Sequence, residues 1–192
     1  MRVNQATGLL EGVRYVASPN CDSRPEDTAL EVLVIHSISL PPGEFGGDDV
    51  EALFCNRLRA ESHPAYRDIA GLRVSAHLFV RRSGEIVQFV PLHLRAWHAG
   101  VSEYRGRSRV NDFSIGIELE GSDHRPYTDA QYAVLTELSV ALLDAYPTLR
   151  SSAIVGHSDV APGRKTDPGP YFEWGRYRRA LSQRLAGEAR PL

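Results

Sequence analysis

The sequence predicts an α/β fold, with a central mixed β-sheet flanked by helices in a single domain. Short apolar runs rich in β-branched residues alternate along the chain with segments whose apolar residues recur at helical spacing. The length of 192 residues suits one domain with its own core, and no repeat or low-complexity linker divides it. We therefore expect one domain over residues 1–192, with a core at about 8–172 and a C-terminal helix at about 171–187.

Several segments are expected to form β-strands. Residues 31–36, EVLVIH, are a short apolar run typical of a buried strand. Residues 75–91 predict two strands joined at a Ser-Gly pair, which is a hairpin signal. Residues 113–121, FSIGIELEG, alternate apolar side chains with other residues at the period of a strand. Residues 151–156, SSAIVG, predict another short buried strand.

Helices are expected between and after these strands. Asp48 is placed to cap a first helix, and Thr128 and Gln131 have the capping-box spacing of a second, which should end near Pro147. A third, amphipathic helix is expected near the C-terminus. The predicted apolar faces are Val50, Leu53, Phe54 and Leu58 in the first helix, Leu135, Leu138 and Leu142 in the second, and Tyr177, Leu181 and Leu185 in the third.

Composition excludes several classes of function. The net charge of −2 provides no broad positive surface, so we expect no nucleic-acid partner. No apolar run approaches the roughly 20 residues that a membrane-spanning helix needs. Residues 1–20 do not have the pattern of a signal peptide, and Cys21 and Cys55 have no CxxC spacing. We expect a cytoplasmic protein with reduced thiols, no membrane association and no evident protein partner.

Two histidines occupy similar positions. His36 directly follows one predicted buried strand and His157 directly follows another. Ligand sites in α/β sheets usually gather at the carboxyl ends of the strands. Together with Asp167, these imidazoles make a metal site more plausible than a structural role for each alone. Two imidazoles and one carboxylate leave a fourth position for water, which is the pattern of catalytic zinc.

The segment 156–169, GHSDVAPGRKTDPG, connects two of these candidate ligands. Its prolines exclude a regular helix, so its polar residues cannot share one helical face. Asp159 competes with Asp167 for the role of ligand, but a turn cap is its commoner role. Lys165 is either a solvated surface lysine or, beside a metal, a group that stabilises an oxyanion.

A general base is expected on the strand within 113–121. Glu118 and Glu120 should project from the face opposite its apolar row. A carboxylate on so apolar a strand is costly unless it has a partner or a task. Alternation does not choose between the two glutamates, although Glu120, beside Gly121, is the better candidate for a solvated edge.

Residues 95–114 have little periodicity and form a long predicted loop, a kind of segment that is often functional. Trp97 has an aromatic ring suited to stacking on a sugar, and several arginines in the loop suit carboxylates. The alternative is that Trp97 is partly buried and only anchors the loop.

Four motifs in order carry a family resemblance: HSISLPPGEFGG, SAHLFVRRSGEIVQFVP, RAWHAGVSEYRGRSRVNDFSIGIELEG and GHSDVAPGRKTDPGP. They resemble the AmpD family, the cytoplasmic 1,6-anhydro-N-acetylmuramyl-L-alanine amidases of bacterial cell-wall recycling. The resemblance runs from about Gly8 to Phe172. It implies a mixed sheet flanked by helices, as in the related peptidoglycan-recognition and phage-lysozyme-type amidases.

The resemblance also implies roles for individual residues. A zinc ion would be held by His36, His157 and Asp167. Glu118, the first glutamate of IGIELEG, would assist the attacking water. Lys165 would stabilise the tetrahedral intermediate.

The implied reaction is zinc-dependent hydrolysis of the amide between the lactyl group of anhydro-muramic acid and L-Ala. The substrate would be a small anhydro-muropeptide, contacted by Trp97, Arg109 and Arg73. Two alternatives are a non-catalytic peptidoglycan-binding module and an amidase that acts on intact peptidoglycan. The complete set of zinc and catalytic residues argues against the first, and the missing export signal against the second.

Overall fold

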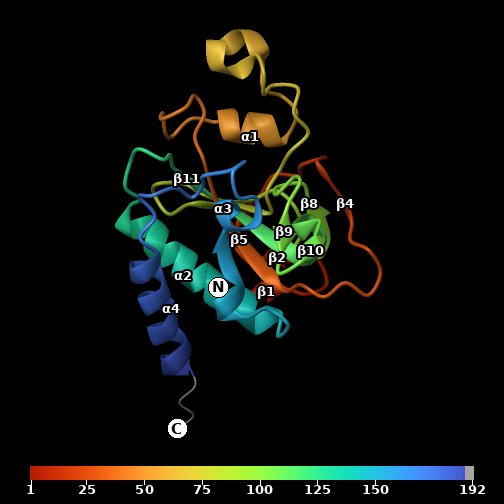
Figure 1. The fold of residues 1–192 in the computed structure, drawn as a ribbon, viewed down its shortest axis with the longest axis vertical. Coiled ribbons are helices and arrows are strands. Elements are labelled where there is room, and N and C mark those ends of the chain that lie inside the picture. The colour runs from red at the N-terminus through yellow and green to blue at the C-terminus, as the bar shows by residue number, and fades with distance from the viewer. Residues whose placement is uncertain (189–192) are drawn as a thin grey trace.

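The computed structural model describes residues 1–188, which form a central mixed sheet with helices packed around it (Figure 1). The strand order is β12-β5-β11-β6-β7-β3, and only the β6–β7 pair is antiparallel. The strands are β3 (Arg14–Tyr15), β5 (Val32–Ile38), β6 (Leu78–Val80), β7 (Ile86–Gln88), β11 (Ser114–Glu120) and β12 (Ile154–Gly156). This arrangement agrees with the predicted fold class and with the predicted hairpin.

Smaller elements surround the sheet. Three further antiparallel pairs are β1 (Val3–Asn4) with β2 (Leu9–Leu10), β4 (Cys21–Ser23) with β8 (Leu94–Ala96), and β9 (Glu103–Tyr104) with β10 (Arg107–Ser108). Short 3₁₀ helices are η1 (Ala60–Ser62), η2 (Pro64–Tyr66), η3 (Val110–Phe113) and η4 (Ser151–Ala153). Residues 95–114, predicted as a loop, therefore contain short ordered elements.

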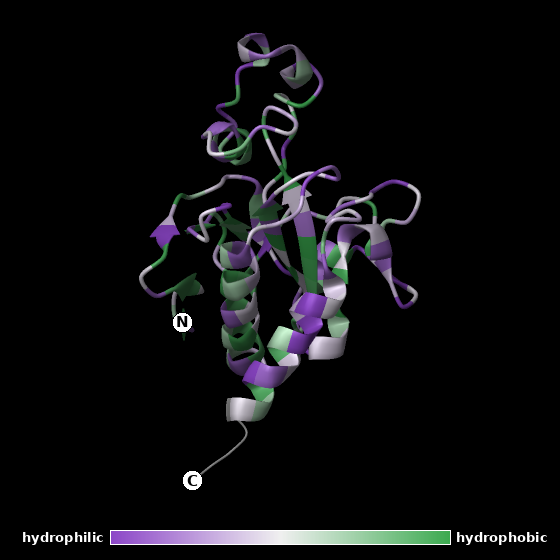
Figure 2. Cartoon of the chain, turned by 90° about the vertical axis from the view of Figure 1, so that its left-hand side faces the viewer, coloured by the Kyte–Doolittle hydropathy of each residue, from purple (hydrophilic) through white to green (hydrophobic). Residues whose placement is uncertain are grey.

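Two long helices cover one face of the sheet. Helices α2 (Asp129–Ala145) and α4 (Trp174–Glu188) lie side by side, and green apolar residues alternate with purple polar ones along them in Figure 2. The predicted capping box is present: the Thr128 Oγ1 accepts from the Gln131 amide at 3.1 Å, and the Gln131 side chain accepts from the Thr128 amide at 3.1 Å. The described part of the chain has no helix both long and apolar enough to cross a membrane.

Part of the other face of the sheet is covered by α1 (Asp49–Phe54) and the chain that follows it, at the opposite end of the molecule from the end of α4 (Figure 1). The helix is shorter than predicted. Leu58 lies beyond its end, although it is still buried. Asp48 occupies the N-cap position without capping, because its carboxylate instead accepts from Arg81 at 2.9 Å.

One predicted strand has different bounds in the structure, and one prediction about a loop was wrong. The strand expected at 31–36 continues to Ile38, because β11 pairs with its whole length. The segment 156–169 does contain helix: α3 (His157–Val160) makes one turn before Pro162, in residues that the ring of that proline does not restrict. Asp159 is the turn cap that was predicted, since its carboxylate accepts from the Gly156 amide at 2.7 Å.

Candidate metal centre and substrate pocket

Register places three candidate residues in one row across neighbouring strands. On β5, His36 pairs with Glu118 of β11. Gly156 of β12 pairs with Ile35, so His157 follows at the level of His36. His36 therefore lies inside its strand, and not at the end as predicted. Because parallel partners at one level project to the same side, the sheet itself brings these side chains together.

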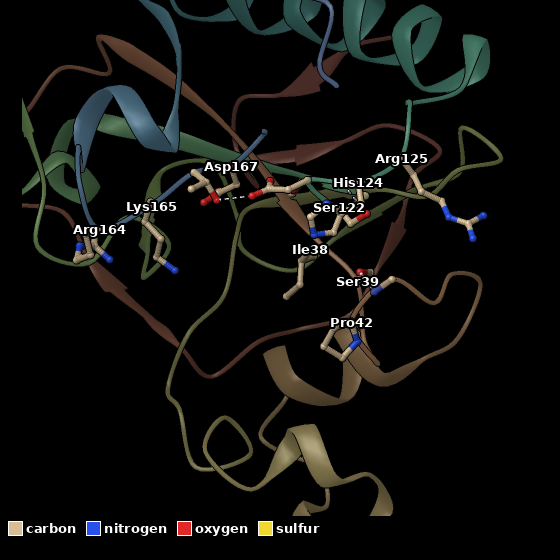
Figure 3. Close-up of a pocket in the computed structure, with 14 residues that line it drawn as sticks. Ile38, Ser39, Pro42, Ser122, His124, Arg125, Arg164, Lys165 and Asp167 are labelled. Carbon is tan, nitrogen blue, oxygen red and sulfur yellow. Dashed lines mark hydrogen bonds between the residues drawn. The ribbon is translucent and has the colours of Figure 1, made fainter. Parts of the chain in front are cut away.

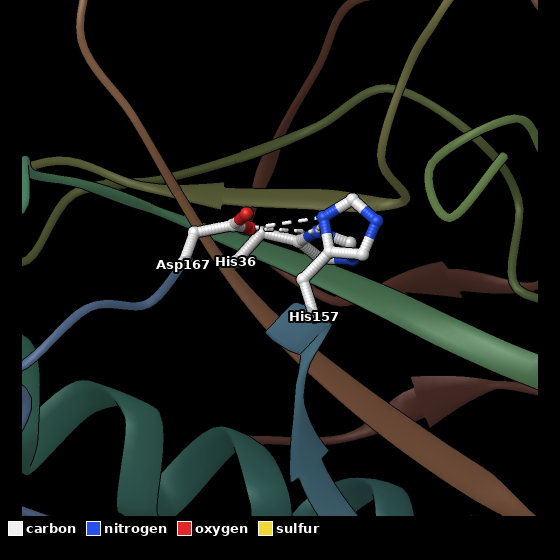
Figure 4. Close-up of side chains that lie close together, drawn as sticks. All are labelled: His36, His157 and Asp167. Carbon is white, nitrogen blue, oxygen red and sulfur yellow. Dashed lines mark hydrogen bonds and ion pairs between the residues drawn. The ribbon is translucent and has the colours of Figure 1, made fainter. Parts of the chain in front are cut away.

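Asp167 completes a three-residue cluster with both imidazoles (Figure 4). The Nδ1 atoms of His36 and His157 are 2.9 Å apart. The Asp167 Oδ2 lies 3.0 Å from Nδ1 of His157 and 3.3 Å from Nδ1 of His36. Ligands at about 2.0–2.1 Å from a tetrahedral ion are roughly 3.3 Å from one another, so the cluster is compatible with a metal site.

The protonation of His157 supports this interpretation. Its Nε2 lies 3.1 Å from the carbonyl oxygen of Ala99. A carbonyl only accepts, so Nε2 carries the hydrogen and Nδ1 keeps a free lone pair directed at Asp167. A lone pair and a carboxylate at this separation repel each other unless a cation or a proton lies between them.

Burial controls the charge of the cluster. Desolvation lowers the pKa of His36 to about 4, which keeps this imidazole neutral at pH 7, the form that binds metals. Burial alone would raise the pKa of Asp167. Its interactions with the neighbouring His157 and His36 outweigh burial and hold that pKa below its usual range. A neutral His36 imidazole beside an ionised Asp167 carboxylate suits the binding of a cation.

The loop that carries Asp167 is held by specific bonds. The Asp167 carbonyl accepts from the Ser158 amide at 3.0 Å, so the loop folds back onto α3. The Tyr127 hydroxyl donates to the Pro168 carbonyl at 2.7 Å, and Thr166 donates to the Asp123 carboxylate at 2.6 Å. These contacts on both sides of Asp167 fix its position relative to the two histidines.

Glu118 is buried beside this cluster without a hydrogen-bond partner for its Oε2 among the described residues. Its Oε1 lies 4.0 Å from Nδ1 of His36. Desolvation, with a smaller contribution from the charge of Asp167, raises the pKa of Glu118 well above its usual value. A buried carboxyl that gains a proton easily is suited to acid–base chemistry.

Glu120 has a different environment, and the expectation of a solvated edge was wrong. Its side chain is only 4% exposed. One carboxylate oxygen accepts from the Gly46 amide and the other from the Arg82 amide at 2.9 Å. Glu120 therefore ties the loop before α1 to the β6–β7 hairpin, which is a structural role.

Two adjoining hollows meet at the cluster. An apolar pocket of about 370 Å³ contains Glu118, His157 and Asp167, and a polar groove of about 590 Å³ runs along its other side. The shared lining residues are Ser37, Ile38, Pro42, Lys165 and Asp167. Figure 3 shows Lys165 and Asp167 toward one end of the groove, with His124 and Arg125 toward the other.

The three residues predicted to contact the substrate lie in different environments. Trp97 lines the apolar pocket, and its indole N–H donates to Asp22 at 3.1 Å, which fixes the ring. Arg109 is exposed and forms an ion pair with Asp112 at 3.1 Å. Arg73 is exposed as well. Neither arginine is among the residues that line the apolar pocket or the polar groove.

Sequence reasoning missed two parts of the site. His98 lines the apolar pocket, with its Nδ1 2.9 Å from Nε2 of His36. Its place beside Trp97 in an aperiodic segment was the available signal. The apolar wall was predicted only as core or left unassigned, because nothing local distinguishes a pocket wall from a core. That wall includes Leu40, Leu53, Phe54, Ala65, Ile69, Leu72 and Val74.

Comparison with known proteins gives the family. The model of a family described as N-acetylmuramoyl-L-alanine amidase matches residues 26–170. The chain belongs to this amidase family. The predicted resemblance is thereby confirmed.

Relatives of this amidase match over nearly its whole length. It is 56% identical over 176 residues to the Escherichia coli protein named 1,6-anhydro-N-acetylmuramyl-L-alanine amidase AmpD, covering 92% of this chain and 96% of that protein. The crystal structure of an AmpD derivative superposes with a TM-score of 0.90 at 53% identity, covering 94% and 99% of the two chains.

A more distant amidase has been solved with a ligand. AmiD from E. coli, in complex with the substrate anhydro-N-acetylmuramic acid-L-Ala-D-gamma-Glu-L-Lys, superposes with a TM-score of 0.61 at 28% identity. The match covers 88% of this chain and 67% of that one. The fold of this chain is thus shared with amidases that differ considerably in sequence.

Proposed function

We propose that this amidase uses zinc to hydrolyse the amide between the lactyl group of a 1,6-anhydro-N-acetylmuramyl peptide and L-Ala. One observation carries the proposal: His36, His157 and Asp167 converge in a pocket beside the buried Glu118, whose Oε2 has no hydrogen-bond partner among the described residues. Support also comes from the 56% identity to a protein named for this reaction.

The metal would be held by Nδ1 of His36, Nδ1 of His157 and a carboxylate oxygen of Asp167. Zinc prefers this combination of nitrogen and oxygen ligands. When bound, it supplies Lewis acidity that activates water and polarises a carbonyl. The remaining chemistry depends on side chains of the chain itself.

Glu118 would accept the proton of the attacking water and deliver it to the leaving L-Ala amine. Its raised pKa favours the first transfer and keeps a proton available for the second. Its position one strand away from His36 places it at the same level of the sheet as the proposed metal ligands. This role accounts for a buried carboxylate whose Oε2 has no hydrogen-bond partner among the described residues.

Lys165 would stabilise the negative charge that develops on the carbonyl oxygen. It lines both hollows at their junction with Asp167, where the scissile amide would lie. An ammonium group in this position donates a hydrogen bond and opposes the new charge.

The two hollows suggest an orientation for the substrate. We place the sugar in the apolar pocket, against the fixed ring of Trp97, and the stem peptide in the polar groove. The substrate in the AmiD complex contains a γ-linked glutamate, whose α-carboxylate is free. The groove offers cationic groups, including Arg125, for such carboxylates.

Arg73 and Arg109 remain proposed substrate contacts. Arg73 lies between Leu72 and Val74, which both line the apolar pocket. The charge of Arg109 acts on Asp22, the residue that accepts the N–H of Trp97. Both would therefore act at the periphery of the sugar site.

We further propose that the enzyme works in the cytoplasm without a protein partner. Cys21 and Cys55 are free thiols, the state that a reducing compartment maintains. Burial raises the pKa of both thiols, so neither is activated as a nucleophile.

The proposal is tested by metal analysis and by mass spectrometry of products from three substrates: an anhydro-muropeptide, the same peptide on a reducing-end muramyl sugar, and intact sacculi. We expect bound zinc, cleavage of the anhydro-muropeptide between lactyl group and L-Ala, and loss of cleavage with a chelator. Absence of both zinc and cleavage would favour a binding module. Cleavage of sacculi alone would favour an amidase for intact peptidoglycan.

A further inference from the structure

A row of imidazoles continues from the candidate metal cluster into the protein: the half-buried His98 and then the fully buried His77. The ring of His36 lies 4.3 Å from that of His157 and 5.0 Å from that of His98. His77 lies behind His98 at 5.7 Å. The proposed reaction uses only His36 and His157 of these residues. The position of His98 beside His36 therefore needs a separate explanation.

His98 and His36 are joined by a hydrogen bond whose direction depends on the metal. Nε2 of His36 is 2.9 Å from Nδ1 of His98. If Nδ1 of His36 binds a metal as a neutral imidazole, Nε2 carries the hydrogen and must donate it. Nδ1 of His98 lies in the place of the acceptor.

The neighbours of His98 are compatible with the tautomer in which Nδ1 accepts. Its Nε2 then carries the hydrogen and lies 3.1 Å from the Ser114 hydroxyl, which is fully buried. The backbone of the His98 segment is fixed by Asn111, whose side-chain oxygen accepts from the amides of His98 at 3.3 Å and Ala99 at 2.8 Å. A continuous path of hydrogen bonds therefore runs from His36 through His98 to Ser114.

Strand β11 has a glycine, Gly116, where it passes the imidazole ring of His98. A Cβ at Gly116 would overlap the imidazole ring of His98. Gly116 lies in the middle of β11, where a glycine otherwise weakens a strand. Close approach of the His98 ring supplies a reason for glycine at this position.

From these contacts we propose that His98 is a positioning residue that accepts the Nε2 hydrogen of His36 and so orients its Nδ1 toward the metal. The inference rests on the proposed metal site. A ligand histidine whose second nitrogen is hydrogen-bonded has a fixed ring and a more basic donor atom. Loss of such a contact typically lowers metal affinity about 10–100-fold.

Three variants separate positioning from structural support. His98→Leu removes the acceptor, whereas His98→Asn keeps an oxygen near the place of Nδ1. His77→Leu is the control, because His77 is a fully buried neighbour of His98 whose nitrogens contact Arg24 and the backbone of Gly116 and Leu94, and not a proposed metal ligand. The zinc dissociation constant is measured by competition with a chromophoric chelator, and Co²⁺ absorption spectra report the ligand geometry. Thermal unfolding of each metal-free variant shows which ones fold.

We expect His98→Leu to raise the zinc dissociation constant about 10–100-fold and to alter the Co²⁺ spectrum. His98→Asn should recover most of the affinity, and His77→Leu should keep the wild-type value. Wild-type affinity in folded His98→Leu overturns the inference, as does an equal loss in all three variants. If His98→Leu does not fold, His98→Asn decides: a wild-type Co²⁺ spectrum supports an acceptor role, and a spectrum without ordered ligands overturns it.

These results are distinguishable from failure of the proposed function. Wild-type protein that binds no zinc would remove the basis of both proposals. Wild-type protein that binds zinc and cleaves the substrate, with folded His98→Leu binding zinc equally well, would overturn only the role of His98.

Discussion

Glu118 and Glu120 lie on the same strand, β11, yet the fold places them in opposite environments. Glu118 lies beside the candidate metal cluster and has an oxygen without a hydrogen-bond partner in the described chain. Glu120 is satisfied by two backbone amides. Burying a carboxylate costs free energy unless hydrogen bonds stabilise it. Its hydrogen bonds explain the burial of Glu120, whereas the burial of Glu118 fits its proposed role as a base.

The strongest test of this contrast is Glu118→Gln. The amide has a similar shape but cannot take a proton from water, so kcat/KM should fall about 10²–10⁴-fold. The measurement is steady-state hydrolysis of an anhydro-muropeptide, with zinc content determined on the same sample. A zinc-loaded variant with wild-type turnover would contradict the assignment of Glu118 as base.

Lys165→Met removes the group that is expected to stabilise the negative charge on the carbonyl oxygen. Removal of one stabilising donor should lower kcat about 10²–10³-fold. Because Lys165 is exposed, the free energy of unfolding should change little. Lys165→Arg, which keeps a cationic donor, should retain more activity than Lys165→Met. If both variants turn over like the wild type, Lys165 is only a surface lysine.

Glu120→Gln should have the opposite pattern, with a small change in kcat and a loss of stability. The new NH₂ group cannot accept from Gly46 or Arg82, and an unsatisfied buried group costs about 1–3 kcal/mol. Urea unfolding measures this loss. Glu85→Gln is a control on the same hairpin: its carboxylate is 49% exposed, and its ion pairs should contribute less than about 1 kcal/mol. Equal stability of both variants would refute a structural role for Glu120.

The smallest effect is expected in the pH dependence of the free energy of unfolding of the metal-free protein. Because the pKa of Glu118 is raised in the folded state, folding favours its protonated form. Its contribution to stability is therefore complete below the unfolded pKa, about 4.3, and is lost as pH rises toward the folded pKa. Glu118→Gln should be nearly as stable as wild type at pH 4 and more stable at pH 7. A difference that does not grow with pH would contradict the raised pKa.

Local patterns predicted the elements that depend on local interactions. The capping box at Thr128 and Gln131, the Ser-Gly hairpin and the alternation of β11 all involve residues close in sequence. Predictions failed where a distant partner decided the outcome. Asp48 was expected to cap α1, but Arg81 takes its carboxylate.

The candidate site also combines features that local sequence predicts with features that depend on distant segments. Residue types, and the resemblance that they carry, were enough to select His36, His157, Asp167, Glu118 and Lys165. Their convergence depends on in-register parallel pairing of β12, β5 and β11, with the loop after α3 tied to Tyr127. No periodicity placed His98 behind His36, because its contact joins segments 62 positions apart.

The sequence by itself determined the fold class, the hairpin, the capped helix and the residue types capable of binding a metal, because periodicity, caps and donor chemistry are local properties. Only the tertiary structure decided which glutamate remains without a partner and which histidine supports a candidate ligand. The physical reason is that burial and hydrogen-bond satisfaction depend on groups contributed by distant segments. For Glu120 these are the amides of Gly46 and Arg82, and Glu118 has no such donor for its Oε2 in the described chain.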